Sequence, residues 1–120
     1  MSPHRAKTME FLNDLVRAAD WDLRFNPHGF PYAALPRGFG NNEAGVKLHF
    51  IPNGGSVRVV GYIDFSEELG IKRPFIYVSI YGDVQQVAQL IQRRFLPRYK
   101  KAWNNAQPLI AKWLEENPQI

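Results

Sequence analysis

The fold is decided by residues 46–64, whose sequence is VKLHFIPNGGSVRVVGYID. Apolar residues occupy alternate positions on both sides of Asn53-Gly54, as expected for two half-buried strands joined by a tight turn. The stretch therefore predicts an antiparallel hairpin. A third strand is predicted for residues 74–81, where β-branched residues again take alternate positions, and the short connection favours an antiparallel meander.

The pairing within this hairpin follows from placing Asn53 and Gly54 at its turn. The predicted cross-strand pairs are Phe50–Val57 and Leu48–Val59 on one face, and His49–Arg58 and Lys47–Val60 on the other. One face is apolar and is expected to pack on the core. The opposite face combines basic and aromatic side chains, namely Lys47, His49, Arg58, Tyr62, Tyr77 and Tyr81.

The segments before the hairpin predict one helix, one strand and a long loop. Apolar residues recur at three- and four-residue steps over residues 8–19, which predicts an amphipathic helix with Thr8 as its N-cap and residues 1–7 as a flexible tail. Residues 21–25 alternate apolar and charged side chains and predict a short strand. Residues 27–45 contain three prolines and four glycines, which indicates a loop.

Helices are predicted after the third strand. Asp83 is the expected N-cap, and apolar residues follow it at helical spacing. Pro97 and Pro108 each either kink a long helix or separate two helices, so two or three C-terminal helices are expected. The predicted fold class is α+β: an N-terminal helix, a short strand, a long loop, a three-stranded antiparallel meander and C-terminal helices packed on the sheet. All 120 residues are assigned to a single domain.

Composition limits the classes of protein to which this chain can belong. Its 45% hydrophobic and 22% charged residues are near the average of globular domains. Because cysteine is absent, disulfides, thiol catalysis and cysteine-ligated zinc are excluded. No apolar run approaches the ~20 residues of a membrane helix, and the first residues lack the apolar core of a signal peptide. We therefore expect a soluble, cytoplasmic protein without a membrane partner.

Catalytic motifs are weak, and we expect a protein that is not an enzyme. No serine lies in a Gly-x-Ser-x-Gly elbow, and the glycine-rich stretches lack the lysine of a phosphate-binding loop. The histidines His4, His28 and His49 fall in separate segments without the spacing of helical metal ligands. No metal or cofactor is therefore predicted. A metal or acid–base role for His49 beside Asp64 or Asp22 is the alternative.

The strongest functional signal is a cluster of basic residues in the C-terminal helices. Residues 83–112 hold six basic residues and one acidic residue, whereas the whole chain has a net charge of +4. The densest part contains Arg93, Arg94, Arg98, Lys100 and Lys101. Such a concentration suits phosphate backbones, because each neutralised phosphate releases counterions. The alternative is a solvated helix face whose cations complement the helix dipole.

The basic and aromatic sheet face is a second candidate surface. Aromatic rings stack on unpaired bases while cations contact the phosphates. The predicted contacts are Lys47, His49, Arg58, Tyr62 and Tyr77. The alternative is that helices cover this face as well, because Val60 in the same row is typical of half-buried packing. The two surfaces together predict a non-enzymatic protein that binds DNA or RNA.

A different function, docking to another protein, is the alternative prediction. The aromatic loop offers residue types that dominate protein interfaces, namely Phe30, Tyr32, Arg37 and Phe39. An adaptor or inhibitor would dock through this loop or through the C-terminal helices, unless the loop folds back over the core. Trp103 and Trp113 lie at helical spacing and predict core contacts or the seam of a homodimer.

Overall fold

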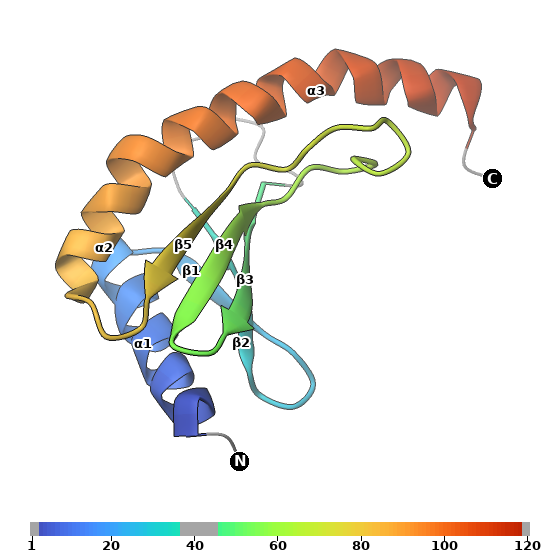
Figure 1. The fold of residues 1–120 in the computed structure, drawn as a ribbon. Coiled ribbons are helices and arrows are strands. Elements are labelled where there is room, and N and C mark those ends of the chain that lie inside the picture. Colours follow the sequence, from blue (N-terminus) through green and yellow to red (C-terminus); the bar gives the residue numbers. More distant parts are fainter. Residues whose placement is uncertain (1–2, 37–45, 119–120) are drawn as a thin grey trace.

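The computed structural model describes residues 3–36 and 46–118 and contains one antiparallel sheet flanked by helices. The elements are α1 (Pro3–Ala19), β1 (Asp22–Phe25), β2 (Pro31–Leu35), β3 (Leu48–Asn53), β4 (Ser56–Gly61), β5 (Phe75–Ser79), α2 (Val84–Leu90), the π-helical segment η1 (Ile91–Phe95) and α3 (Leu96–Glu116). The strands lie side by side in chain order, β1-β2-β3-β4-β5 (Figure 1). The α+β class and the antiparallel meander are thus confirmed.

The sheet has five strands where the sequence predicts a meander of three. The predicted short strand is present as β1, and β2 lies in the segment predicted to be a loop. Pro31 is tolerated because it occupies the first position of its strand. Arg24 pairs with Ala33 and Phe25 with Pro31, so Tyr32 is an extra residue and forms a β-bulge. The loop prediction is therefore wrong for residues 31–35.

The β3–β4 hairpin has a different register from the predicted one. Asn53 pairs with Ser56, so the two turn residues are Gly54 and Gly55. Gly54 has a φ of +62°, a conformation that glycine adopts at the first central position of a type II′ turn. The observed pairs are Leu48–Gly61, His49–Val60, Phe50–Val59 and Ile51–Arg58. This shift of two residues leaves every side chain on its predicted face, because side chains alternate with a period of two.

The N-terminal helix is longer than predicted. It begins at Pro3, a residue type favoured at the first helical position, so residues 3–7 form its first turns. Thr8 lies inside the helix, where its buried hydroxyl donates to the His4 carbonyl at 2.6 Å. The predicted N-cap is therefore wrong. The N-cap predicted for α2 is confirmed, since the Asp83 carboxylate accepts backbone N–H bonds from the first turn.

The C-terminal helices form one continuous span, which Figure 1 shows as a single curved ribbon. Directly before Pro97 the helix widens into a π turn, in which the Leu96 N–H bonds to the Ile91 carbonyl. Proline has no N–H and its ring crowds the carbonyl four residues back, so a wider turn accommodates it. Pro108 lies inside α3 without dividing it. The prediction of two or three separate helices is corrected to one span.

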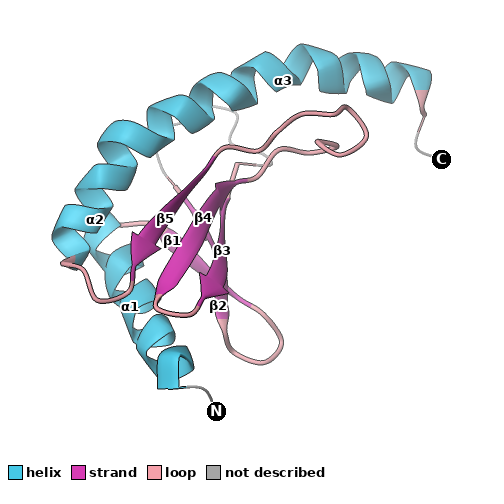
Figure 2. Ribbon diagram, in the orientation of Figure 1, coloured by secondary structure: helices cyan, strands magenta, loops and turns pink. Residues whose placement is uncertain are grey.

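All helices contribute to one apolar core on a single face of the sheet. Buried residues of α1, η1 and α3 form one cluster with the inward residues of the strands, such as Leu48, Phe50, Val57 and Val59. The far end of α3 extends beyond the strands, over the β4–β5 loop (Figure 2). There Trp113 stacks on Phe65 with ring centroids 4.6 Å apart. No helix in the described ranges has an apolar stretch long enough to cross a bilayer.

Tyr99 fastens the middle of the helical span to the sheet. Its side chain is fully buried, and its ring lies directly against Gly61. The hydroxyl donates to the Tyr62 carbonyl at 2.7 Å and accepts from the Lys47 N–H at 3.1 Å. One side chain therefore joins α3 to the ends of β3 and β4, where several of the predicted functional residues lie.

Candidate functional site

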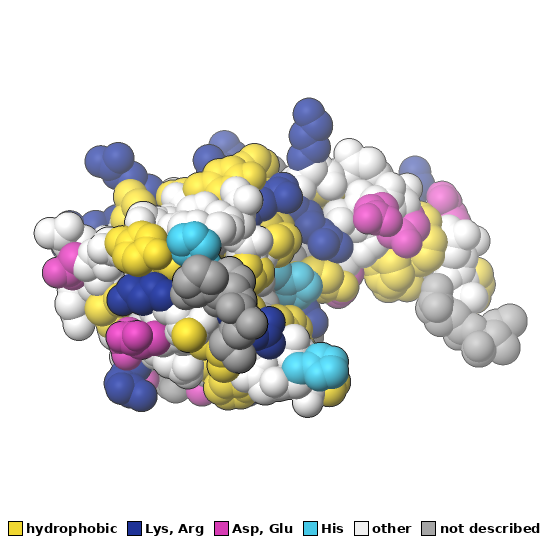
Figure 3. Space-filling view, turned by 60° about the horizontal axis from the view of Figure 1, so that its bottom comes forward, with side chains coloured by type: hydrophobic (Ala, Val, Ile, Leu, Met, Phe, Trp, Pro, Cys, Tyr) yellow, Lys and Arg dark blue, Asp and Glu magenta, His cyan; other side chains and the backbone are white. Residues whose placement is uncertain are grey.

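The face of the sheet opposite the core is left open by every helix of the described chain. Ile51, Phe75 and Tyr77 are 45%, 42% and 52% exposed there. Aromatic and cationic side chains gather on this face around two aliphatic ones. We call the whole set the open sheet face, and it consists of Tyr32, Lys47, His49, Ile51, Arg58, Val60, Tyr62, Arg73, Phe75 and Tyr77. Figure 3, viewed toward the end that carries the β3–β4 turn, shows Lys and Arg side chains among hydrophobic ones on the surface.

Five residues predicted from the sequence lie together on this face, namely Lys47, His49, Arg58, Tyr62 and Tyr77. Sequence reasoning missed Arg73, because a long loop brings it back to the sheet. It also missed Phe75, although Phe75 and Tyr77 are two residues apart in one strand and therefore share a face. Tyr81 leaves the face, since its hydroxyl lies 3.2 Å from His4 Nδ1 on α1. Val60 is on the face but is only 6% exposed, beneath its larger neighbours.

Tyr62 organises one end of the open sheet face. Lys47 Nζ and Arg73 Cζ each lie 4.7 Å from the centre of its ring, and the His49 ring centroid is 5.0 Å away. Cation–π contacts of this kind hold charged groups in place without neutralising them. Burial lowers the pKa of His49, and the nearby Lys47 and Arg73 charges lower it further. The imidazole is therefore neutral at pH 7, and the positive charge comes from lysine and arginine.

A second aromatic cluster lies at the β5 edge. The Arg58 guanidinium sits 4.2 Å from the centre of the Phe75 ring, and Phe75 meets Tyr77 edge to face with centroids 5.8 Å apart. From α3, Arg98 donates to the Phe75 carbonyl at 2.5 Å. Arg98 thus links the helical cations to the margin of the open sheet face.

The other helical cations form a separate surface. Arg93, Arg94, Lys100 and Lys101 are exposed, whereas the residues that face the sheet from the same span are buried. These helices cover the opposite side of the sheet from the open face. The structure therefore separates the two predicted basic regions, with Arg98 between them.

Of the residues predicted for protein docking, Phe30 and Tyr32 lie within the described ranges and do not share an exposed surface. Phe30 is buried in the core, with Arg5 Cζ 5.0 Å from the centre of its ring, while Tyr32 is exposed. Arg37 and Phe39 lie outside the described residues. Trp103 is a core residue, as predicted. The homodimer seam stays a prediction.

His, Asp and Glu side chains do not come together in groups of three that could hold a metal ion, within the ranges that the structure describes.

Comparison of the chain with protein-family models, curated proteins and solved structures finds no match. Fold and site define an α+β domain whose antiparallel sheet is covered by helices on one face and presents aromatic and cationic side chains on the other.

Proposed function

We propose that this protein binds single-stranded nucleic acid on its open sheet face and does so without catalysis. The observation that carries the proposal is the presence of exposed rings and arginine and lysine side chains on one face that no described helix covers. Unpaired bases present flat surfaces to such rings, whereas a duplex hides them. A single strand therefore fits this face better than a duplex.

The charges of the face support the same proposal. The cations of the open sheet face form no ion pair with a described carboxylate, whereas Lys7 pairs with Glu10 on α1. Lys47, Arg58 and Arg73 are instead held by aromatic rings. Binding of phosphates to these cations should weaken as salt rises, because bound phosphates release counterions.

Replacing Tyr77 by alanine tests the stacking surface. Tyr77 is half exposed, so its removal should leave the fold intact. Loss of one stacked base costs about 1–3 kcal/mol, and we expect roughly 5- to 160-fold weaker binding of a fluorescent single-stranded oligonucleotide, measured by anisotropy at fixed salt. Tyr81→Ala is the matched control, because Tyr81 is also exposed but contacts α1. Equal losses in both variants, or no binding by the unmodified protein at low salt, contradict the proposal.

Removing charge from the helices should have a different effect. Replacement of Arg93, Arg94 and Lys101 by glutamine leaves the open face untouched. We expect weaker binding of all oligonucleotides at low salt and a less steep dependence on salt concentration, with the preference for single strands unchanged. If this triple variant abolishes binding and Tyr77→Ala does not, the helical surface is the main site.

Docking to a protein is the second candidate. It is favoured by Leu109 and Leu114 of α3, which are 49% and 37% exposed. Leu109 also lines an apolar hollow with Ile71, Ala102 and Ala106, and contiguous apolar surface of this kind marks protein-interaction sites. A protein that binds no oligonucleotide at low salt but loses a partner on Leu109→Glu substitution would favour this function.

A further inference from the structure

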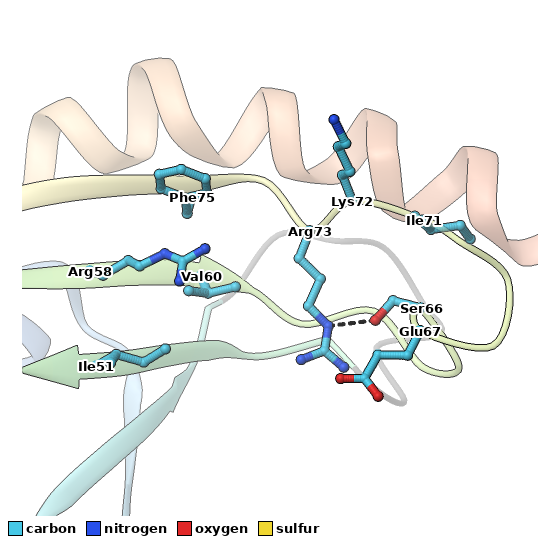
Figure 4. Close-up of a pocket in the computed structure, with 9 residues that line it drawn as sticks. All are labelled: Ile51, Arg58, Val60, Ser66, Glu67, Ile71, Lys72, Arg73 and Phe75. Carbon is cyan, nitrogen blue, oxygen red and sulfur yellow. Dashed lines mark hydrogen bonds between the residues drawn. The ribbon is translucent and has the colours of Figure 1, made fainter.

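A pocket of about 450 Å³ lies where the open sheet face meets the β4–β5 loop (Figure 4). Its volume falls within the usual ~300–1,000 Å³ of small-ligand sites. The residues that matter most for its chemistry are Ile51, Arg58, Val60, Ser66, Arg73 and Phe75. Figure 4 shows Arg58 and Arg73 on either side of Val60, one from the sheet and one from the loop.

The sheet side of the pocket is largely apolar. Ile51, Val60 and Phe75 supply its hydrophobic surface, and the Arg58 guanidinium lies over the Phe75 ring. Arg58 Nε is buried and has no hydrogen-bond partner among the residues that the structure describes. A stacked guanidinium can contact both planar rings and anions, as arginine does in nucleic-acid sites.

The loop side of the pocket is cationic and fixed in position. Arg73 Nε donates to Ser66 Oγ at 2.7 Å, one Nη donates to the Ile63 carbonyl at 3.4 Å, and the Tyr62 ring lies against the guanidinium. Within the described part of the chain, these bonds use two of the five N–H donors of Arg73 and leave the others for a ligand. Glu67 also lines the pocket but forms no ion pair within the described residues.

We infer that this pocket holds one nucleotide of a bound strand, with the base against Phe75 and Arg58 and the phosphate on Arg73. The inference rests on the proposed function and adds to it the position where one base and one phosphate are bound together. An apolar, aromatic half beside a fixed arginine matches the two halves of a nucleoside monophosphate. The prepositioned guanidinium binds a phosphate without losing further side-chain freedom.

Calorimetric titration tests the inference with uridine 5′-monophosphate, uridine and inorganic phosphate as probes. We expect the monophosphate to bind at least about tenfold more tightly than either half alone, since both sides of the pocket are then used. Arg73→Gln should lower its affinity about tenfold or more, because charge-assisted hydrogen bonds are lost. Arg93→Gln, on the helical surface, is the control and should leave the affinity unchanged.

A second pair of variants keeps the test decisive if Arg73→Gln does not fold. Ile51 is 45% exposed and pairs with Arg58 across the strands. Ile51→Glu sets a carboxylate beside Arg58 and should weaken monophosphate binding about tenfold relative to Ile51→Gln, which has the same length and no charge. Equal affinities of these two variants overturn the inference.

An oligonucleotide titrated in parallel separates the inference from the proposed function. If the oligonucleotide binds and the monophosphate neither binds nor competes with it, the pocket inference is overturned and the proposed function stands. If the monophosphate binds and no oligonucleotide does, the pocket is a site for a free nucleotide and the proposed function fails. Binding of both, with the Ile51→Glu loss shared by both probes, supports the two together.

Discussion

Replacing Gly61 by alanine is expected to destabilise the protein by about 3 kcal/mol or more, enough to unfold a marginally stable domain. An added Cβ would lie 2.4 Å from Tyr99 Cδ1 and 2.7 Å from Cγ. These are atoms at the base of the ring, so the ring cannot turn away from the methyl group. The hydroxyl at its other end is held by the Tyr62 carbonyl. Equilibrium unfolding in urea, followed by circular dichroism, measures the loss.

Gly82→Ala is the matched control for this substitution. The nearest atom to a Cβ at Gly82 is Val87 Cγ2 at 3.4 Å, an ordinary contact distance. We expect a change of roughly 1 kcal/mol or less, since surface substitutions without a clash are usually mild. If Gly61→Ala is as stable as Gly82→Ala, the Tyr99 ring of α3 does not lie against Gly61 at the end of β4.

The faces of the hairpin could be predicted from the sequence, although its register could not. Alternation fixes the face of each side chain, and an error of two residues in pairing preserves that face. Lys47, His49 and Arg58 therefore lie on the predicted side of the sheet. Asn53-Gly54 and Gly54-Gly55 are both acceptable turns by local chemistry, so the choice between them depends on contacts elsewhere, including Tyr99 against Gly61.

The features that sequence reasoning missed depend on distant contacts. β2 is a strand because β1 and β3 pair with it on both sides, which overrides a proline- and glycine-rich composition. From the sequence alone, Pro97 could equally kink the helix or end it. In the structure the helix continues through a π turn, and Phe95 and Tyr99 are buried and stacked with ring centroids 6.3 Å apart. The basic helical cluster is visible in the sequence, but only the packing of α3 shows that it lies away from the open sheet face.

Removing the Tyr99 hydroxyl is expected to cost about 1–3 kcal/mol at neutral pH. Tyr99→Phe keeps the buried ring but leaves the Lys47 N–H and the Tyr62 carbonyl without this hydroxyl as partner. Unsatisfied buried backbone groups lose roughly this amount of free energy. Urea unfolding at pH 7.5 measures the loss. A variant as stable as the unmodified protein would show that the hydroxyl does not hold α3 to the sheet.

The same hydroxyl makes stability depend on pH in the alkaline range. Burial raises the pKa of Tyr99 to about 12, against about 10 for an unfolded tyrosine. Below pH 10 both states keep the proton, and the contribution of the hydroxyl is fully present. Between pH 10 and 12 only the unfolded state releases the proton, so the free energy of unfolding falls by about 1.4 kcal/mol per pH unit. All other ionisable groups are the same in the unmodified protein and in Tyr99→Phe, so their effects cancel in the comparison. We therefore expect the stability difference between the two proteins to be constant up to pH 10 and to shrink above it. Unfolding curves recorded from pH 8 to 11.5 that stay equally far apart would contradict this role of the buried hydroxyl.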